Sequence, residues 1–411
     1  MTRSDAPVEP EQATRRTRPL QVLWLIKGLG PGGAERLLAQ SARYRDRAHV
    51  TGRVAYLLPW KNALVGEFTR EDVPATCFGA RGSWDPRWLA GLRRSLRREP
   101  VDVVHVHSPL AAIGARLTVR TLPRAQRPRV VTTEHNVWAS HTGLTSFGNA
   151  LTARLDDART AVSAAVRDSM PKRLRANTEV VRYGVDVDAV RVARSAREEM
   201  RQALAIREDE IAIGTVANLR RNKAYPDLLA AARVVCDELP HVRFVTVGQG
   251  PLEAEIHAEH ARQGLGDRFA LLGYRDDATR VMAACDVFCL ASHHEGLPVA
   301  MMEAIVLGLP VVATDVGGIR ELVADGREAI LVPAGRPEQL ASALARVATD
   351  AALRGRLGAA AAAGADELSV ERAIRRTEAV YSEVCARRAR PWTRTRSVSH
   401  TPRTGPRSWS C

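Results

Sequence analysis

The sequence predicts an α/β fold made of two doubly wound parallel sheets. Short apolar runs rich in β-branched residues alternate with stretches rich in Ala, Leu and Arg, and the whole pattern occurs twice. Apolar strands without a polar face are typical of parallel sheets that helices cover on both sides. The length of 411 residues also favours two domains, because single cores stop growing at roughly 250–300 residues.

The first domain is expected over residues 20–187, after a disordered N-terminal segment of residues 1–19. Six apolar runs mark its strands, and helical stretches separate them. In chain order these runs are QVLWLI, VTGRVAYLL, VDVVHVH, RVVTTEH, RTAVSA and EVVRYGVD.

The pattern restarts after the charged stretch of residues 191–210, and the second domain is expected over residues 188–370. Its strands are IAIGTVA, RFVTVGQG, RFALLGY, VFCLAS, PVVATD and AILVPA. The boundary is placed near residues 186–200, a polar segment that resembles a linker leading into a helix. A C-terminal helix is expected over residues 371–388, and the basic, Ser-, Thr- and Pro-rich residues 389–411 are expected to be disordered.

The formal net charge of +14 indicates an anionic partner. Phosphate-bearing ligands or an anionic membrane surface fit such a field, whereas no helix-turn-helix, RNP or zinc-finger pattern supports nucleic acid. Only four of the cationic residues are lysines, at positions 27, 61, 172 and 223. The excess of arginine is therefore also consistent with a compositional bias.

The sequence shows no targeting segment and no membrane span. Its first twenty residues contain no apolar stretch of signal-peptide length, and its six cysteines are scattered without a CxxC pair. We expect a cytoplasmic protein with reduced thiols. In residues 86–98 the apolar side chains share one helical face and the arginines the other, so this helix either packs on the sheet or contacts anionic lipid at the inner membrane face.

The loop after the first strand contains four glycines before a helix, in Gly28-Leu29-Gly30-Pro31-Gly32-Gly33. A dinucleotide-binding loop would also need an acidic residue about 20 positions further on, and the strand that ends in YLLPW has none. Backbone N–H groups of Gly32 and Gly33 can instead face a phosphate or sugar oxygen in a cleft. A purely structural turn is the other alternative.

A second loop, Asn218-Leu219-Arg220-Arg221-Asn222-Lys223, follows the first strand of the second domain and precedes a helix. Ligands of open α/β sheets bind beyond the carboxyl ends of the strands. Arg220 and Lys223 can therefore converge on a diphosphate and neutralise the charge of a leaving group, and Asn218 begins the same loop. The alternative is that these charges are solvated.

The third element, residues 292–304, turns from a strand end into a helix with Pro298 near its start. N–H groups of Gly296, Leu297 and Val299 would face an anion. Glu303 would be buried in an apolar helix unless ribose hydroxyls donate hydrogen bonds to it, and Glu295 can accept hydrogen bonds from a sugar. Helix capping or ion pairing of the two glutamates is the structural alternative.

Histidines mark strand ends of the first domain. His135, in the run Thr133-Glu134-His135-Asn136, is placed to face the second domain and contact the transferred sugar. His105 and His107 are two residues apart and so lie on one side of their strand. A metal pair is conceivable there, but no third ligand is evident, and we favour a place in the cleft lining or the core.

Together these motifs resemble the family 4 retaining glycosyltransferases, the group 1 glycosyltransferases of GT-B fold, from residue 20 to residue 388. The resemblance rests on GPGGAER at 30–36, TEHN ending at Asn136, VSAAV at 162–166, YGVD at 183–186, NLRRNK at 218–223, VGQGP at 247–251, LGYRDD at 272–277 and HHEGLPVAMMEAIVLGLPVVATDVGG at 293–318. It departs from the family at Ala224, where glycine usually follows the lysine, and at Asn218, where arginine is also common.

The resemblance implies two Rossmann-like domains that face a cleft, with C-terminal helices packing back on the N-terminal domain. It also implies that Arg220 and Lys223 bind donor phosphates, that Glu295 and Glu303 bind the sugar and ribose, and that transfer retains the anomeric configuration without a metal or other cofactor. The donor would be a nucleoside-diphosphate sugar. The acceptor would be a glycan, a lipid-linked molecule or a small molecule, in polysaccharide or glycoconjugate biosynthesis. A nucleotide-sugar 2-epimerase and a degenerate sugar-binding protein are the alternatives.

Overall fold

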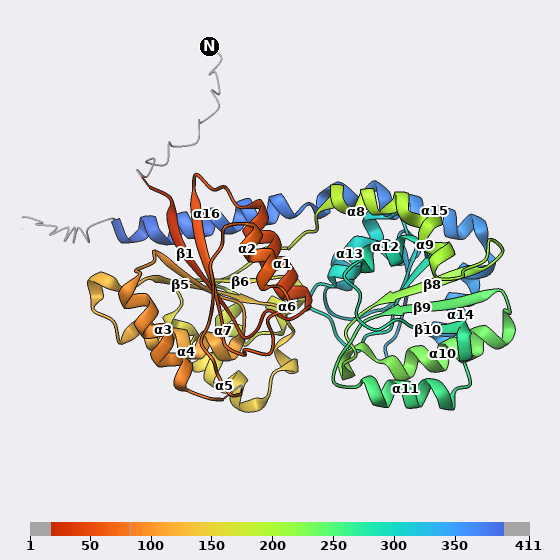
Figure 1. The fold of residues 1–411 in the computed structure, drawn as a ribbon, viewed down its shortest axis with the longest axis horizontal. Helices are drawn as coiled ribbons and strands as arrows, with labels where there is room; N and C mark the ends of the chain where they lie inside the picture. Colours follow the sequence, from red (N-terminus) through yellow and green to blue (C-terminus); the bar gives the residue numbers. More distant parts are fainter. Residues whose placement is uncertain (1–17, 83, 390–411) are drawn as a thin grey trace, which may run out of the picture.

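The computed structural model describes residues 18–82 and 84–389. Two α/β domains lie side by side along the long axis of the molecule (Figure 1). The two-domain fold expected from the sequence is thus confirmed. The segments for which disorder is expected, residues 1–19 and 389–411, lie almost entirely outside the described residues.

The first sheet joins seven parallel strands of the described chain, in the order β3-β2-β1-β4-β5-β6-β7. The strands are β1 (Leu20–Ile26), β2 (Val50–Tyr56), β3 (Ala75–Cys77), β4 (Val103–Val106), β5 (Arg129–Glu134), β6 (Ala158–Ala161) and β7 (Thr178–Val180). Six of them lie in the apolar runs. β3 is not predicted, because it is a three-residue edge strand whose side chains are largely exposed and which therefore has no apolar signal.

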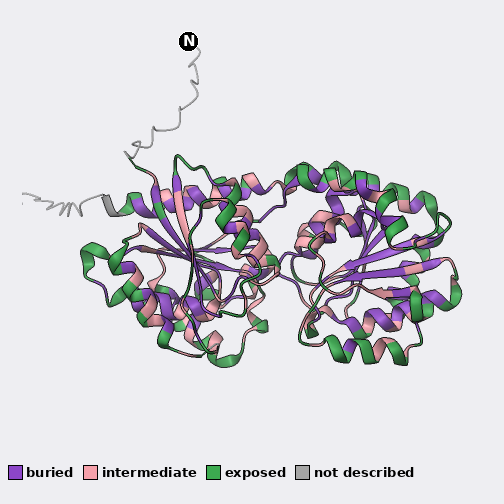
Figure 2. Ribbon diagram, in the orientation of Figure 1, coloured by how far each residue is buried: buried purple, intermediate pink, exposed green. Residues whose placement is uncertain are grey.

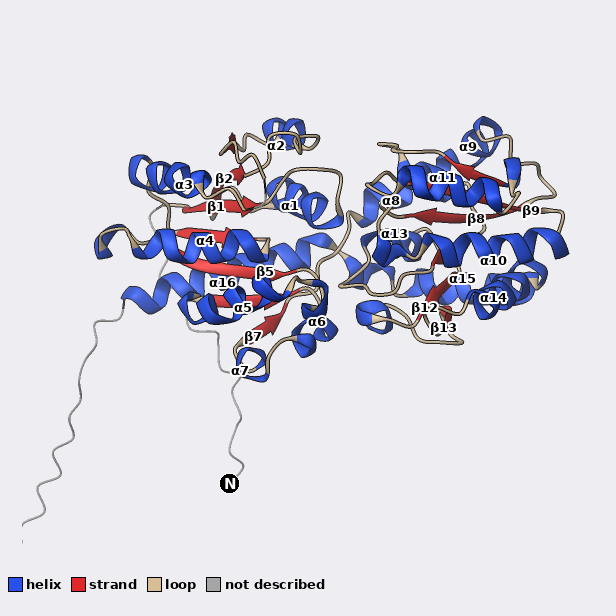
Figure 3. Ribbon diagram, turned by 90° about the horizontal axis from the view of Figure 1, so that it is seen from below, coloured by secondary structure: helices blue, strands red, loops and turns tan. Residues whose placement is uncertain are grey.

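Helices cover both faces of this sheet (Figure 3). They are α1 (Gly33–Tyr44), α2 (Val65–Arg70), α3 (Arg87–Arg98), α4 (Pro109–Arg120), α5 (Gly143–Thr152), α6 (Ala164–Ser169) and α7 (Lys172–Arg175). One core lies between the sheet and α1 and α2, and another lies between the sheet and α3 and α4. Trp88, Leu92 and Leu96 of α3 are buried in the second core. The apolar face of the basic helix predicted over residues 86–98 therefore packs on the sheet and does not face lipid.

The second sheet has six parallel strands in the described residues, in the order β10-β9-β8-β11-β12-β13. They are β8 (Ile211–Val216), β9 (Val242–Val247), β10 (Phe269–Leu271), β11 (Val287–Leu290), β12 (Val311–Thr314) and β13 (Ala329–Val332). Its helices are α8 (Val187–Ala193), α9 (Arg197–Ala203), α10 (Tyr225–Glu238), α11 (Glu253–Arg262), α12 (Ala278–Ala283), α13 (Val299–Val306), α14 (Pro337–Thr349) and α15 (Ala351–Ala363). The polar segment near residues 186–200 is thus helical, and α8 contacts α12 and α13 of the second domain.

The C-terminal helix α16 (Val370–Ala389) runs back along the first domain (Figure 1). Val380, Tyr381 and Val384 of this helix are buried in one core with residues of β1 and α1. The indole N–H of Trp24 in β1 donates a hydrogen bond of 3.2 Å to the hydroxyl of Tyr381. The expected packing of the C-terminal helices on the N-terminal domain is therefore confirmed.

Apart from the edge strand β3, both sheets keep their strands largely buried, while their helices expose one side to solvent (Figure 2). The winding direction reverses between β1 and β4 in the first sheet and between β8 and β11 in the second. At such a point two neighbouring loops diverge and leave a crevice beyond the carboxyl ends of the strands, where ligands of doubly wound sheets bind. This topology places the loops after β1, β4, β8 and β11 at the candidate site.

Candidate active site

A cleft of about 890 Å³ lies between the two domains, and the loops at the two topological switch points line it. Its N-terminal wall includes Gly28 and residues 30–35 after β1, His107 after β4 and His135 after β5. Its C-terminal wall includes residues 249–250 after β9, residues 294–299 after β11 and, from the loop after β8, Asn218, Arg220, Asn222 and Lys223. Nearly all the residues singled out in the sequence therefore meet in one place.

Two helix N-termini meet across this cleft, one from each domain. Gly33 is the first residue of α1 and Val299 is the first residue of α13. A Cβ atom added to Gly33 would lie 3.3 Å from a methyl group of Val299. Both helix dipoles therefore present their positive ends to the same space, and both lack a side-chain cap. Gly32 and Pro298, which precede the two helices, also line the cleft.

The turn before α13 adds further donors to the same wall. Gly296 and Leu297 line the cleft, and within the described residues their N–H groups have no hydrogen-bond partner. A Cβ on Gly296 would lie 2.0 Å from the carbonyl oxygen of His135, so this turn touches the first domain directly. Such unpaired N–H groups beside a helix N-terminus favour an anion.

Lys223 and Glu295 form an ion pair in the cleft. The Nζ atom of Lys223 lies 2.5 Å from Oε1 of Glu295, and the hydroxyl of Ser292 donates a hydrogen bond of 2.5 Å to the same oxygen. Only 7% of the Glu295 side chain and 18% of the Lys223 side chain are exposed. The ion pair holds both side chains in the C-terminal wall of the cleft, which Asn218 and Arg220 also line.

Ala224 explains why glycine is usual after this lysine in the family that the sequence resembles. Its backbone is left-handed, with φ at 49° and ψ at 45°, and it ends the short helix η5 (Arg221–Lys223). A side chain in this conformation costs roughly 1–2 kcal/mol, whereas glycine adopts it freely. The alanine at this position therefore adds backbone strain beside Lys223.

Glu303 does not line the cleft among the described residues. It lies on α13, behind the helix N-terminus, and burial raises its pKa to about 7 while the charge of Arg36 on α1 acts in the opposite direction. The side chain is half-buried, and the charge of Arg36 reaches it from the first domain. The sequence predicts its burial but gives no sign of its proximity to Arg36.

His135 lines the cleft at the end of β5. Its Nε2 atom lies 3.1 Å from Nδ1 of His107, and its ring stacks on Tyr183 with 5.7 Å between the ring centroids. Burial lowers the pKa of His135 to about 4, so the imidazole is neutral at pH 7 and can both donate and accept a hydrogen bond. This is the protonation state that suits contact with a sugar hydroxyl.

The paired histidines of β4 and its loop have different places. His105 is buried between Tyr381 and Thr133, and its ring nitrogens lie 2.6 Å and 2.7 Å from their hydroxyls. His107 lines the cleft beside His135. Of the two places expected from the sequence, His105 thus lies in the core and His107 in the cleft lining. In the described parts of the chain, no group of three or more His, Cys, Asp or Glu side chains is arranged to hold a metal ion.

Two cationic residues of the cleft were missed in the sequence. Lys27 and Lys61 line the N-terminal wall with Glu35. Burial and the charges of Lys61 and Arg220 lower the pKa of Lys27, and burial raises the pKa of Glu35. No ion pair joins Lys27, Lys61 or Arg220 to an acidic residue in the described chain. The rarity of lysine is the signal that could have identified this pair, because three of the four lysines line the cleft.

Comparisons with known proteins agree with this geometry. Residues 31–189 match the model of "Glycosyltransferase Family 4", and residues 196–363 match that of "Glycosyl transferases group 1". A D-inositol 3-phosphate glycosyltransferase of Streptomyces bingchenggensis is 30% identical over 364 residues, which cover 80% of this chain and 75% of that protein. A UDP-Gal:alpha-D-GlcNAc-diphosphoundecaprenol alpha-1,3-galactosyltransferase of Escherichia coli is 27% identical over 299 residues, covering 68% and 75% of the two chains.

Among solved structures, Anabaena Alr3699/HepE in complex with UDP and glucose superposes with a TM-score of 0.77. It is 23% identical in sequence, and the match covers 89% of this chain and all of that chain. This likeness shows the fold. The two family models, the relatives and the paired Rossmann-like sheets together establish that the chain belongs to the group 1, family 4 glycosyltransferases of GT-B fold.

Proposed function

We propose that the chain transfers a hexosyl or related sugar from a nucleoside-diphosphate sugar to an acceptor, with retention of the anomeric configuration. The observation that carries the proposal is the meeting of the α1 and α13 N-termini in a cleft whose walls also hold Lys27, Lys61 and Arg220. Helix N-termini and unpaired cations together attract a multiply charged anion. A diphosphate bridging the two domains has the charge and the size that such a site requires.

Lys223 and Arg220 are proposed to neutralise the leaving nucleoside diphosphate without a metal cofactor. Charge on the diphosphate grows as its bond to the sugar breaks, and a fixed cation stabilises that charge more in the transition state than in the ground state. Because Glu295 already holds Lys223 in place, little reorganisation is needed when the donor binds. Glu303 is proposed to accept hydrogen bonds from the ribose.

Retention is proposed to follow from attack on the face that the leaving group departs. The acceptor hydroxyl forms a bond to the anomeric carbon, the bond from that carbon to the diphosphate oxygen breaks, and the hydroxyl proton passes to a phosphate oxygen of the leaving group. Glu295 is engaged by Lys223 and Ser292, which favours a role in accepting hydrogen bonds from sugar hydroxyls over attack as a nucleophile. His135 would bind the transferred sugar from the opposite wall.

The acceptor is proposed to be a glycan, a lipid-linked molecule or a small molecule of glycoconjugate biosynthesis, bound on the N-terminal side of the cleft. The two relatives described above are named for different acceptors, an inositol phosphate and a diphosphoundecaprenol-linked sugar. Both acceptors carry phosphate, and Lys27 and Lys61 give the N-terminal wall a positive charge. The structural neighbour was solved with UDP, which makes UDP the first nucleotide to test.

Two measurements test the proposal. Thermal shift with a panel of nucleoside diphosphates and their sugars identifies the donor, since a ligand at about 100 times its Kd stabilises the fold by roughly 2.7 kcal/mol. NMR of the glycoside product then gives the anomeric configuration. A shift with one nucleotide class and a retained product support the proposal. An inverted product overturns the mechanism, and release of a free epimerised sugar would indicate an epimerase instead.

A further inference from the structure

Helix α5 carries a stripe of exposed apolar side chains. Leu144, Phe147 and Leu151 are 68%, 67% and 51% exposed. Their spacing of three and then four residues places them on one face of the helix. Single exposed apolar residues are ordinary on protein surfaces, but three large ones in line on one helix mark an interaction surface.

The sides of α5 away from the stripe pack against α4, so the stripe has a fixed direction. A Cβ on Gly148 would lie 3.0 Å from Ile113 of α4, and the guanidinium of Arg116 on α4 donates hydrogen bonds to Asn149 and Thr152. One turn after Ile113, Leu117 on α4 is 50% exposed. Because α4 and α5 are held side by side, the stripe continues from α5 towards the neighbouring helix.

The segments next to this stripe carry arginines but no acidic residues. Helix α3, residues 109–128 and residues 137–155 contain no Asp or Glu. Helices α3, α4 and α5 lie on one side of the first sheet (Figures 1 and 3). Six exposed arginines of these segments have no acidic partner within 4 Å in the described chain: Arg93, Arg94, Arg97, Arg98, Arg120 and Arg154. This face therefore combines exposed apolar groups with unpaired positive charge.

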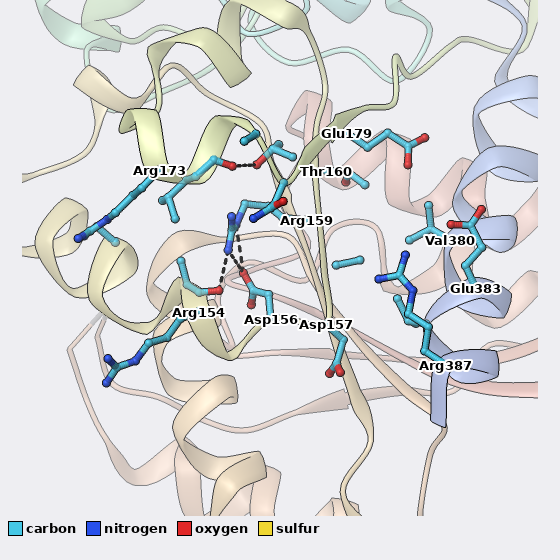
Figure 4. A pocket seen from close by; sticks show the side chains of 18 of the residues that line it. Arg154, Asp156, Asp157, Arg159, Thr160, Arg173, Glu179, Val380, Glu383 and Arg387 are labelled. Carbon is cyan, nitrogen blue, oxygen red and sulfur yellow. Dashed lines mark hydrogen bonds and ion pairs between the residues drawn. The ribbon is translucent and has the colours of Figure 1, made fainter. Parts of the chain in front are cut away.

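A pocket of about 820 Å³, lined by four arginines and four acidic residues, lies beyond the end of α5. Leu151 and Arg154 line it together with Arg173 of α7 and Arg387 of α16. Figure 4 shows the guanidinium groups of Arg154 and Arg173 reaching to the same side of this pocket. The acidic residues of this pocket are already paired with arginines. Asp156 pairs with Arg116 and Arg159, Asp157 pairs with Arg129, and Arg376 pairs with both Glu179 and Glu383.

The stripe also begins close to the cleft. Ser140 and His141 line the cleft, and α5 starts at Gly143, two residues further along the chain. A surface on which the stripe rests would therefore lie beside the acceptor side of the cleft. An acceptor held at that surface could therefore reach the cleft without a movement of the two domains.

We propose that the face formed by α3, α4 and α5 docks on an anionic membrane surface. Leu144, Phe147 and Leu151 would enter the interface between headgroups and acyl chains, and the arginines of α3 and α4 would contact lipid phosphates. A second copy of the chain is disfavoured as the occupant, because an isologous contact would bring the unpaired arginines of two copies together. The acceptor would then be lipid-linked, the one step that rests on the proposed function.

Co-sedimentation of the full chain with vesicles tests the surface without any donor or acceptor. Vesicles of phosphatidylcholine alone are compared with vesicles that also contain phosphatidylglycerol, at low and high salt. We expect salt-sensitive binding to the anionic vesicles only. The double variant Leu144→Ser/Phe147→Ser should bind at least tenfold more weakly, and Arg93→Ser/Arg97→Ser should lose most of the salt-sensitive part.

The matched control is Val192→Ser, since Val192 on α8 of the second domain is 71% exposed. It should bind vesicles like the wild type. Unchanged binding of Leu144→Ser/Phe147→Ser, or its dissociation from a dimer to a monomer in sedimentation velocity, would overturn the proposal. The same variant should keep wild-type turnover on a water-soluble acceptor, so failure to dock is distinguishable from failure of the proposed transfer.

Discussion

At the scale of single residues, the ion pair of Lys223 and Glu295 determines which charges of the cleft are available to a bound donor. The two charges compensate each other in the free protein, whereas Lys27, Lys61 and Arg220 have no acidic partner among the described residues. An incoming diphosphate would thus find three unpaired cations and a fourth that can turn from Glu295 towards it. Glu295 would then be free to accept hydrogen bonds from the sugar.

Replacement of Lys223 by alanine is expected to reduce transfer strongly. A charge-assisted hydrogen bond contributes roughly 1.5–3 kcal/mol, and more of it is expressed as the leaving group gains charge. At about 1.4 kcal/mol per tenfold, kcat/KM should fall by about 10- to 100-fold, and the affinity for the nucleoside diphosphate should weaken as well. Steady-state kinetics and isothermal titration calorimetry measure the two quantities.

Lys172→Ala is the matched control, because Lys172 on α7 is exposed and does not line the cleft. It should leave turnover unchanged. Some loss of stability is expected for Lys223→Ala, because Ser292 alone would remain as donor to the nearly buried Glu295 carboxylate. Wild-type turnover together with wild-type product affinity would show that Lys223 is only a structural partner of Glu295.

Glu303 gives a prediction for pH dependence. Burial raises its pKa from the ordinary 4.5 to about 7. Between these values the folded chain holds a proton that the unfolded chain has lost, so the free energy of unfolding should fall as pH rises from 4.5 to 7. Glu303→Gln should remove this part of the slope, measured by urea denaturation at several pH values. It should also weaken nucleotide binding about tenfold, by loss of the proposed contact to the ribose.

Glu378→Gln separates the two effects of this substitution. Burial also raises the pKa of Glu378 to about 7, but this residue lies on α16 and its carboxylate accepts a hydrogen bond from the backbone of Asp46. The control should therefore lose a similar part of the pH slope and keep wild-type nucleotide affinity. Equal loss of affinity in both variants would argue against contact of Glu303 with the ribose.

The sequence predicts those residues of the candidate site that belong to continuous motifs. Lys223, Glu295 and Gly33 follow strands whose ends can be located from apolar runs, and parallel topology brings such ends together. Lys27 and Lys61 stand on two separate loops without a motif, and only the packing of Lys61 over Gly28 makes them neighbours. Whether the charge of Arg36 reaches Glu303 depends on how the two domains meet. No local sequence pattern contains that information.

At the scale of elements, α16 is tied to the cleft by a line of buried polar groups. The hydroxyl of Tyr381 contacts Trp24 and His105, the ring of His105 lies 4.1 Å from that of His107, and His107 contacts His135. Burial lowers the pKa of His105 to about 3 and holds that of His107 well below its usual value. A neutral chain of histidines thus connects the returning helix with the end of β5.

Tyr381→Phe should destabilise the first domain. It leaves the buried indole N–H of Trp24 and Nδ1 of His105 without their shared partner, and each unsatisfied buried group costs about 1–3 kcal/mol. The midpoint of urea denaturation should fall while the slope of the transition stays constant. Tyr274→Phe is the control, because Tyr274 is 45% exposed, and it should change the midpoint little. A midpoint equal to wild type for Tyr381→Phe would mean that water replaces the hydroxyl.

The elements themselves are predictable where burial is complete. Buried parallel strands such as β1, β4 and β12 are largely apolar and therefore stand out in the sequence. β3 does not, because its place at the sheet edge exposes it. The helix of residues 86–98 has two faces that suit either a sheet or a membrane, and only the position of β4 beside β1 decides which face is covered.

At the scale of the whole molecule, the two domains touch through specific contacts around the cleft. The carboxylate of Glu321, in η7 (Gly317–Glu321) of the second domain, accepts hydrogen bonds from the N–H groups of Ala164 and Ala165 at the start of α6. Gly296 lies against the carbonyl of His135, and Gly318 lies near Ser163. These contacts align the turn before α13 with the strand end that carries His135.

Gly296→Ala tests whether this alignment is the catalytic one. The added Cβ would lie 2.0 Å from the carbonyl oxygen of His135, which is closer than two such atoms can approach, so the domains must separate. Each core stays intact, and the thermal midpoint should therefore change little. A displacement of about 1 Å at a reacting centre can cost about 100-fold in rate, so kcat should fall at least about tenfold. Small-angle scattering should show a larger radius of gyration.

The control variant is Gly355→Ala on α15, where an added Cβ meets nothing within 4 Å. It should stabilise the fold by roughly 0.5–1 kcal/mol and leave kcat unchanged. If Gly296→Ala keeps wild-type turnover, the contact with His135 does not belong to the arrangement in which the sugar is transferred.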